Sequence, residues 1–363
     1  MDLNRRSFLK GALASAAAAA ASGIPLPQAV RAETGQELAT MLDLSKCIGC
    51  ETCVEACREA NAKYMPEPIK PIPQMFPSRV PIEDWSDQRE VTDRLTPYNW
   101  LYVQTAKVQK DGQEQEVYIP RRCMHCQNPP CANLCPWGAA EKKPNGLTHI
   151  NPDTCLGGAK CKQVCPWGIP QRQSGVGLYL KLATSYAGNG VMYKCHRCYE
   201  RLEQGELPAC IEACPENVQS IGPRDEILAK AHARAREING YVYGEHENGG
   251  TNTIYVSPVP FEELDKSIQA DIEQSIDDEV GRLRKAGKGE GRGSGDRKRL
   301  GRKMRGGRPH MKPVENSMAK AENLTLALML APVAGAAVAF HKVRGFFGGP
   351  DKDGRAEANS DEK

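Results

Sequence analysis

Cysteines carry most of the chemistry that this sequence can do. The chain has 363 residues and 15 cysteines, an odd total, and the cysteines fall into four tight runs. Small secreted domains with evenly counted cysteines suggest disulfides, whereas an odd count in tight groups indicates metal chemistry. The runs are Cys47, Cys50, Cys53 and Cys57; Cys123, Cys126, Cys131 and Cys135; Cys155, Cys161 and Cys165; and Cys195, Cys198, Cys210 and Cys214.

The spacing within these runs predicts iron–sulfur clusters. In the bacterial ferredoxin pattern C-x2-C-x2-C-x3-C-P, the last cysteine ligates the other cluster of a pair, and three of the four runs here end in Cys-Pro. Three closely spaced thiolates on one loop can hold three irons of a cubane, while the fourth points away toward a neighbouring cluster. Two runs therefore interlock into one module with two clusters, and four runs predict two modules and four clusters. Zinc bound by paired C-x-x-C elements and structural disulfides are the alternatives.

The third run lacks one cysteine. In DTCLGGAKCKQVCPWGIPQ, residues 153–171, Gly158 stands where a fourth cysteine is expected. A site with three thiolates suits a [3Fe–4S] cluster, and its reduction potential would differ because cluster type and net charge set it. The other interpretation keeps four irons, with water or a nearby side chain at the open corner.

Residues 41–222, with these four runs, resemble the four-cluster ferredoxin-type electron-transfer subunits of respiratory oxidoreductases. The resemblance implies that the first run pairs with the fourth and the second with the third. The implied cofactors are three [4Fe–4S] clusters and one [3Fe–4S] cluster, or four [4Fe–4S] clusters of which one has a non-cysteine ligand. The implied ligands are Cys47, Cys50, Cys53 and Cys214 for the first cluster; Cys57, Cys195, Cys198 and Cys210 for the second; Cys123, Cys126, Cys131 and Cys165 for the third; and Cys135, Cys155 and Cys161, with an open position at Gly158, for the fourth.

Short elements must position these loops. Residues 99–120 predict a β-hairpin, because apolar residues alternate on both arms and Asp111-Gly112 marks the turn. The proline-rich residues 58–99 predict an extended insertion laid over the first module. The expected fold class is α+β, with two interlocked bacterial-type ferredoxin (double-cluster) modules, insertions and a C-terminal transmembrane helix. Further strands are predicted at residues 147–150, 218–221 and 252–257, and a helix at residues 225–237.

The low content of aromatic residues suggests that the cores of this protein form largely around cofactors. The hydrophobic content is 40% and the aromatic content only 6%, which is thin for a chain of two or three modest domains. The net charge of +3 hides a basic segment, residues 282–312, with thirteen Lys or Arg and two acidic residues. This segment is rich in glycine and poor in apolar residues, so the prediction is a disordered linker.

Both ends of the chain predict membrane-related segments. Arg5 and Arg6 precede a Ser-Phe-Leu-Lys sequence and an alanine-rich run, the pattern of a twin-arginine export signal cleaved after Ala32. An ordinary secretory signal or an N-terminal anchor is the alternative. The uncharged run Leu324–Phe340 predicts a membrane anchor at the short end of spanning length, with a buried soluble helix as the alternative.

These boundaries divide the chain into five parts. The predicted domains are the signal peptide, residues 1–32; a four-cluster ferredoxin-like domain, residues 33–265; a basic Gly-rich linker, residues 266–322; a transmembrane helix, residues 323–341; and a polar tail, residues 342–363. The two modules would form from runs 47–57 with 195–214 and 123–135 with 155–165.

The whole plan, including the segment YVYGEHENGGTNTIYVSPVPFEEL, resembles two narrower groups. These are the tail-anchored iron–sulfur subunit of the hydrogenase-2 type and the iron–sulfur subunit of the high-molecular-weight cytochrome c transmembrane complex of sulfate reducers. The resemblance implies a protein at the periplasmic face of the cytoplasmic membrane. It would relay single electrons between a hydrogenase or multihaem cytochrome c and a polytopic membrane subunit that interacts with quinone or haem.

Other function classes are weaker. No Ser/His/Asp or carboxylate constellation indicates a substrate pocket, so we expect an electron-transfer subunit rather than an enzyme on its own. An exported protein would not meet nucleic acid, despite the basic linker. The alternatives are the iron–sulfur subunit of a molybdopterin oxidoreductase and a redox-sensing or structural cluster protein. The three-cysteine run and the linker depart from the hydrogenase pattern, which leaves the partner open.

Overall fold

A computed structural model describes residues 36–110, 112–182, 190–285 and 294–331, together with residues 333 and 336. The predicted signal peptide, residues 1–32, and the polar tail, residues 342–363, lie outside the described residues. The described elements combine short helices, a four-stranded sheet and three two-stranded sheets. The prediction of an α+β fold is therefore confirmed for this part of the chain.

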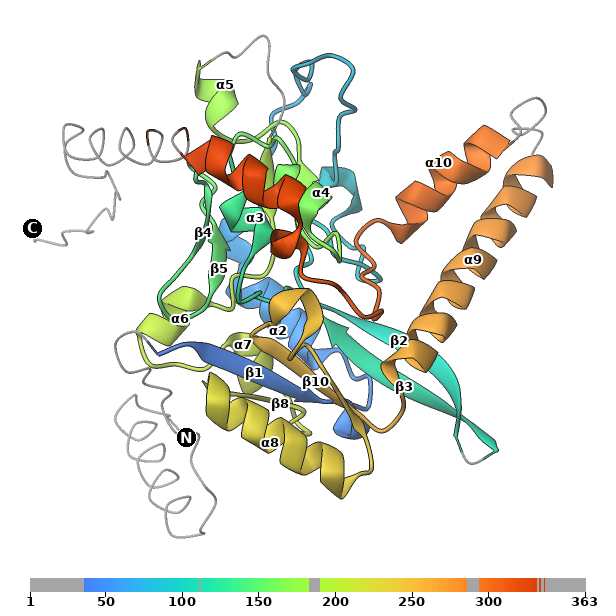
Figure 1. The fold of residues 1–363 in the computed structure, drawn as a ribbon. Helices are drawn as coiled ribbons and strands as arrows, with labels where there is room; N and C mark the ends of the chain where they lie inside the picture. Colours follow the sequence, from blue (N-terminus) through green and yellow to red (C-terminus); the bar gives the residue numbers. More distant parts are fainter. Residues whose placement is uncertain are drawn as a thin grey trace, which may run out of the picture.

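The four-stranded sheet has the order β8-β1-β10-β9 (Figure 1). Its two central strands pair in parallel, and every residue in both is buried, as expected of a strand covered on both faces. Helix α8 covers one face through Ile227 and Ala231, while α2 and α7 lie on the other side (Figure 1). The bounds are β1 (Leu38–Asp43), β8 (Gln219–Pro223), β9 (Tyr241–Tyr243), β10 (Thr253–Ser257), α2 (Thr52–Ala60), α7 (Ala209–Glu212) and α8 (Arg224–Glu237).

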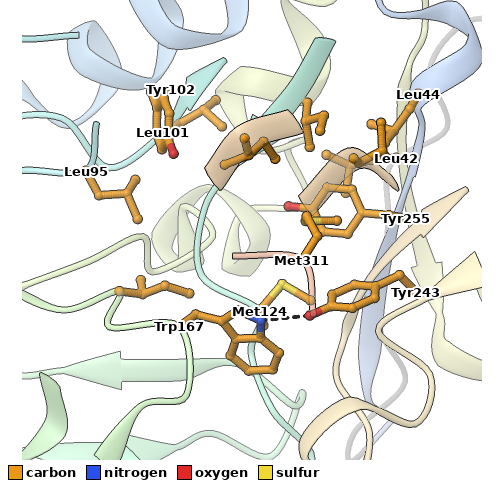
Figure 2. Packing of buried hydrophobic residues seen from close by; sticks show 14 of the residues in the cluster. Leu42, Leu44, Leu95, Leu101, Tyr102, Met124, Trp167, Tyr243, Tyr255 and Met311 are labelled. Carbon is orange, nitrogen blue, oxygen red and sulfur yellow. Dashed lines mark hydrogen bonds between the residues drawn. The ribbon is translucent and has the colours of Figure 1, made fainter. Parts of the chain in front are cut away.

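A long hairpin leaves this sheet on one side. Strands β2 (Tyr102–Lys110) and β3 (Gln113–Arg121) are antiparallel, with Tyr102 opposite Arg121, and helix α9 (Phe261–Lys285) packs along β2. Figure 2 shows the core where these elements meet, with Tyr255 and Met311 among its labelled residues. The predicted hairpin is confirmed, as are the strands and the helix predicted at residues 147–150, 218–221, 252–257 and 225–237.

The chain around the second and third runs forms a smaller unit of short elements. Two hairpin-like pairs, β4–β5 and β6–β7, surround two short helices, and a separate small core includes Val176 and Val191. The bounds are α3 (Pro130–Asn133), β4 (Ala140–Lys142), β5 (Thr148–Ile150), α4 (Lys160–Val164), β6 (Gln171–Gln173), α5 (Leu178–Leu182), β7 (Val191–Tyr193) and α6 (Tyr199–Glu203).

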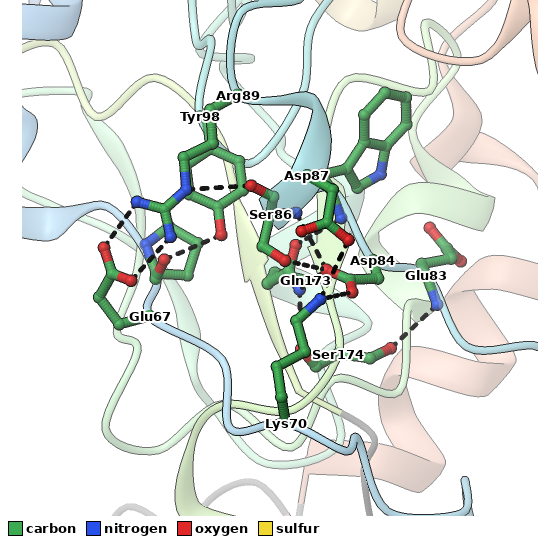
Figure 3. A network of polar contacts seen from close by, with 12 residues as sticks. Glu67, Lys70, Glu83, Asp84, Ser86, Asp87, Arg89, Tyr98, Gln173 and Ser174 are labelled. Carbon is green, nitrogen blue, oxygen red and sulfur yellow. Dashed lines mark hydrogen bonds and ion pairs between the residues drawn. The ribbon is translucent and has the colours of Figure 1, made fainter.

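The proline-rich insertion extends beyond the place that the sequence predicts. Its polar side chains bind the segment that follows the third run, and Figure 3 shows this network. The amide nitrogen of Gln173 donates to a carboxylate oxygen of Asp84 at 2.9 Å, and the backbone of Ser174 donates to Glu83 at 2.8 Å. Lys70 forms an ion pair with Asp84. The insertion therefore contacts both modules. Its later part lies beside the second module, while Lys63 forms a 2.7 Å ion pair with Glu200 and Tyr64 packs edge-on against His196 of the first module. The expectation that it lies over the first module holds only for its start.

The disorder predicted for residues 282–312 is wrong for the part that the structure describes. Helix α9 runs through the predicted domain boundary at residue 265, and a second helix, α10 (Ser294–Arg305), packs against it. Arg297 forms a 2.7 Å ion pair with Asp277, and Arg305 pairs with Glu273. Basic residues thus meet the acidic face of α9, because the two charge runs are complementary. Residues 286–293 lie outside the described part.

The predicted membrane anchor lies only partly within the described residues. Residues 321–331 are helical, and most of the remaining apolar run lies outside the description. Among the helices that the structure does describe, none combines the length and the hydropathy needed to cross a bilayer.

Candidate iron–sulfur cluster sites

Four cysteines of the first and fourth runs line one small cavity, and the resemblance assigns these four to one cluster. They are Cys47, Cys50, Cys53 and Cys214. The loop that carries three of them turns at Gly49, whose φ of +72° is in the left-handed region that favours glycine. A β-carbon there would also lie 2.6 Å from the ring of Tyr118. The hairpin therefore fixes this loop from outside.

Hydrogen bonds from backbone and hydroxyl groups reach the sulfurs of this first group. The backbone nitrogen of Val218 donates to Cys214 Sγ at 3.4 Å, and the hydroxyl of Thr52 donates to Cys50 Sγ at 3.4 Å. Hydrogen bonds to cluster sulfurs stabilise the more negative, reduced form. Cys50 is exposed whereas Cys53 is buried, so the first group lies at the protein surface.

The second group joins the remaining cysteine of the first run to three cysteines of the fourth. Burial raises the pKa of the Cys57 thiol well above its usual value, and the neighbouring thiols of Cys210, Cys195 and Cys198 raise it further. The backbone nitrogen of Arg197 donates to Cys195 Sγ at 3.3 Å. These four cysteines therefore converge from α2, α7 and the loop before α6.

A second small cavity is lined by cysteines of the second and third runs: Cys123, Cys126, Cys131 and Cys165. Trp167 closes it from one side and is only 4% exposed. Its indole nitrogen donates to the hydroxyl of Tyr243 at 2.9 Å (Figure 2). This bond holds the indole in place, so that the wall of the third group is apolar and excludes water.

The fourth group contains only three cysteines. Burial raises the pKa of the Cys155 thiol, and Cys135 contributes to the shift. Cys161 lies near both. Gly158 is exposed, and a β-carbon built there meets no described atom within 4 Å. The position where a fourth ligand is expected is therefore open space.

The thiols fit a multi-iron group. Burial raises the pKa of Cys53 and Cys131 to about 12 and of Cys165 and Cys198 to about 11. Such thiols stay protonated at neutral pH unless a strong positive centre, such as bound iron, takes the place of the protons. The structure has all 15 cysteines as free thiols. Among the described residues, no three His, Cys, Asp or Glu side chains are close enough to hold one metal ion.

The four groups follow one another in a row. Cys53 of the first group lies near Cys210 of the second, and Cys195 of the second lies near Cys123 of the third. Cys161 of the fourth group lies near Cys165 of the third. The order is therefore first, second, third and fourth, with each group adjacent to the next.

Two histidines lie inside C-x-x-C pairs and face away from the solvent. Burial lowers the pKa of His125 well below its usual value and the pKa of His196 to about 4. His125 accepts a hydrogen bond from the backbone of Thr148 at 3.0 Å. Both imidazoles are therefore neutral, and they pack against the loops.

The cysteine spacing does not predict two buried cations, Arg122 and Lys194. Each directly precedes the first cysteine of a run, and each is almost completely buried. A basic residue immediately before a C-x-x-C pair is the signal that could have identified them.

Comparison with known protein families gives three matches. Residues 46–139 and residues 115–224 each match a family described as a 4Fe-4S dicluster domain. Residues 2–22 match the twin-arginine translocation signal sequence. The predicted export signal is thereby confirmed, and the two dicluster matches support iron–sulfur clusters, roughly four in number.

Three relatives with known names align with more than half of this chain. The Hydrogenase-2 operon protein HybA of Escherichia coli O157:H7 is 30% identical over 307 residues, which cover 72% of this chain and 83% of that protein. A subunit of the sulfite dehydrogenase of Allochromatium vinosum is 29% identical, with 56% of this chain and 76% of that protein covered. The nitrate-inducible formate dehydrogenase iron-sulfur subunit of E. coli K12 is 28% identical, with 65% and 73% covered.

These similarities agree with the arrangement of the cysteines in a row of adjacent groups. The extent of the match to HybA, together with both dicluster domains, shows that this chain belongs to the family of ferredoxin-type iron–sulfur subunits of respiratory complexes.

Proposed function

We propose that this protein relays single electrons along a row of four iron–sulfur clusters. The observation that carries the proposal is the adjacency of the four cysteine groups: cysteines of the first three groups pack in one core, and Cys131 of the third group packs with Cys155 and Cys161 of the fourth. When bound, each cluster takes up and releases one electron. The protein fixes the spacing of the clusters and adjusts their potentials.

In this proposal the ligands are the cysteines of the four groups, and the second module carries the three-thiolate site. The fourth cluster is a [3Fe–4S] cluster held by Cys135, Cys155 and Cys161. The open space at Gly158 supports this choice, because no described side chain approaches its β-carbon position within 4 Å. The other three groups hold [4Fe–4S] clusters, since each offers four cysteines.

The chain's own residues contribute to such a relay in three ways. Thiolates from pairs of distant runs hold each cluster in place, so that the row is rigid. Backbone and hydroxyl donors such as Val218 and Thr52 stabilise charge on the sulfurs. Buried aromatic side chains such as Trp167 exclude water.

Electrons enter and leave at the two ends of the row. At the first group Cys50 is exposed, and the neighbouring Ile48 is 57% exposed. At the fourth group Gly158 is exposed, and Trp137, two residues after Cys135, is 45% exposed. We propose that one end meets an extracytoplasmic hydrogenase or multihaem cytochrome c and that the other meets a membrane subunit that interacts with quinone or haem.

The twin-arginine signal supports a location outside the cytoplasm. We propose that residues 323–341 anchor the protein to the cytoplasmic membrane, so that the relay works at its periplasmic face. The uncharged run Leu324–Phe340 supports this anchor.

A second candidate is the iron–sulfur subunit of a molybdopterin oxidoreductase. Two relatives are named as subunits of sulfite dehydrogenase and formate dehydrogenase, which favours it. The relative with the highest stated identity among the three described above comes from a hydrogenase-2 operon, which favours the first candidate. The relay is the same in both, and the partners differ.

Removal of one cluster from the middle of the row tests the relay. In the complex purified with its native neighbours, Cys198→Ser should abolish electron transfer from the extracytoplasmic partner to the membrane subunit, because the second group links the first to the third. Thr52→Val is the matched control, since it removes a hydrogen bond to Cys50 and keeps every thiolate. If the Cys198→Ser complex assembles with its other clusters and still transfers electrons at the wild-type rate, the clusters are a scaffold and the proposal fails.

A further inference from the structure

Two buried cations, Arg122 and Lys194, lie between neighbouring cysteine groups. Arg122 is 2% exposed and Lys194 is 6% exposed, although Arg and Lys side chains are almost never fully buried unless they are paired. Their hydrogen bonds in the described part of the chain go to sulfur and to backbone oxygens rather than to carboxylates. Each therefore needs negative charge from another source.

Arg122 points at the second cysteine group. Its Nη1 donates to Cys210 Sγ at 2.9 Å, and its charge also acts on Cys195 and Cys53. Its Nε and Nη2 atoms are buried and have no hydrogen-bond partner among the described residues. A guanidinium with unsatisfied donors beside four thiolates is placed to interact with the cluster that those thiolates hold.

Lys194 occupies the next junction. Its ammonium donates to the carbonyl oxygens of Thr148 and Cys195, the latter at 3.1 Å. It also lines the cavity of the third group and lies near Cys123 and Cys131. The two cations therefore flank the second group, with Arg122 on the side of the first group and Lys194 on the side of the third.

Arg121 provides an internal comparison. It directly precedes Arg122 and is equally buried, at 1% exposure, but successive residues of an extended chain point to opposite sides. Its guanidinium donates to His310 O at 2.8 Å and to Met311 Sδ, and it stacks 5.7 Å from the ring centroid of Tyr255. Its hydrogen bonds thus go to the C-terminal segment instead of to a cysteine.

We propose that Arg122 raises the reduction potential of the second cluster, with Lys194 acting in the same sense from the side of the third group. The inference rests on the proposed function, since it requires clusters in these groups. Reduction adds one negative charge to a cluster, and a fixed positive charge at hydrogen-bond distance stabilises that reduced form in a medium of low dielectric constant. The second cluster therefore has a higher potential than its thiolates alone would give.

The test is a redox titration of the full-length protein, matured and purified anaerobically and followed by electron paramagnetic resonance. The signal of the second cluster is assigned beforehand as the one that Cys198→Ser removes. Arg122→Gln should make reduction of the second cluster at least tenfold less favourable, about 59 mV for a one-electron couple. The fourth cluster should keep its potential. Arg122→Lys, which keeps the charge, should recover most of the shift.

Two further variants distinguish an effect of the missing charge on the reduction potential from an effect of the substitution on folding. Arg121→Gln removes an equally buried charge one residue away and should leave the second potential unchanged. Lys194→Gln should lower the reduction potentials of the second and third clusters. If Arg122→Gln does not bind iron, this variant still measures how a buried positive charge affects the potential of the second cluster. A wild-type potential in Arg122→Gln, or an equal shift in Arg121→Gln, would overturn the inference. Wild-type protein that contains no clusters would instead refute the proposed function.

Discussion

Gly158 shows how much a single residue can decide in this protein. In the proposed assignment, three of the four cysteine groups offer four thiolates, and the fourth group offers three, with glycine at the expected fourth position. The backbone there is outside the left-handed region, and a β-carbon has open space around it. The site could therefore accept a cysteine without strain, which supports the proposal that glycine at this position accounts for the missing fourth thiolate.

Gly158→Cys should convert the fourth site to a [4Fe–4S] cluster, because it supplies the missing thiolate. The iron content should rise by about one atom per chain, and the paramagnetic signal of the oxidised [3Fe–4S] cluster should disappear. Gly158→Ala is the control, since it fills the same space without a sulfur. An unchanged iron count together with an unchanged signal in Gly158→Cys would contradict the three-iron assignment.

At the scale of single residues, the sequence provides candidate ligands but not their environment. Cysteine spacing identifies the runs, because ligand geometry limits how close thiolates on one loop can be. It does not predict Arg122 or Lys194, whose roles depend on contacts with Cys210 and Cys123, residues of other runs. Those contacts exist only once the runs have interlocked.

Among the elements, the helical pair α9–α10 and the segment that follows it depart most from expectation. Composition alone argues for disorder in a Gly-rich basic segment. The structure stabilises it through complementary charge on α9 and through Met311, which is completely buried in the main core. Local patterns such as the β2–β3 hairpin are predictable because their partners are close in sequence. The parallel pairing of β1 with β10 and the docking of the insertion on β6 depend on distant partners.

Met311, rather than the surface ion pairs, should hold this C-terminal segment in place. Met311→Ala should cost about 2–5 kcal/mol locally, the usual cost of truncating a buried methionine. Arg297→Ala should cost less than about 1 kcal/mol, because its ion pairs with Asp277 and Glu273 are exposed to solvent. Limited proteolysis between residues 294 and 318 measures the difference. Equal cleavage rates in the two variants would show that burial of Met311 is not the dominant contact.

At the scale of the whole molecule, cysteines form part of hydrophobic cores that in other proteins consist of apolar side chains alone. The main core includes cysteines of the first three groups, and the smaller core beside α3 and α4 includes Cys131, Cys155 and Cys161. The core between α8 and the four-stranded sheet contains none. Cofactor binding and folding should therefore be coupled in most of the molecule but not beneath the sheet.

Removal of the clusters by oxidation and chelation should unfold the second module before the sheet. In hydrogen exchange, the amides of α3 and α4 should lose most of their protection in the apoprotein, because the buried cysteines there have lost their ligands. The amides of β1 and β10 should retain more of theirs, since Met41, Ile254 and Val256 on the α8 side of these strands pack in a core that contains no cysteine. Equal protection of α3 and α4 with and without iron would contradict this coupling.

The central claim is that four groups of cysteines hold a row of iron–sulfur clusters, and the most direct measurement is the iron and acid-labile sulfide content of the anaerobically purified protein. Three four-iron clusters and one three-iron cluster predict about 15 iron atoms and about 16 sulfides per chain. The fully oxidised sample should show a single [3Fe–4S] paramagnetic signal. A correctly folded protein with neither stoichiometric iron nor sulfide would contradict the account.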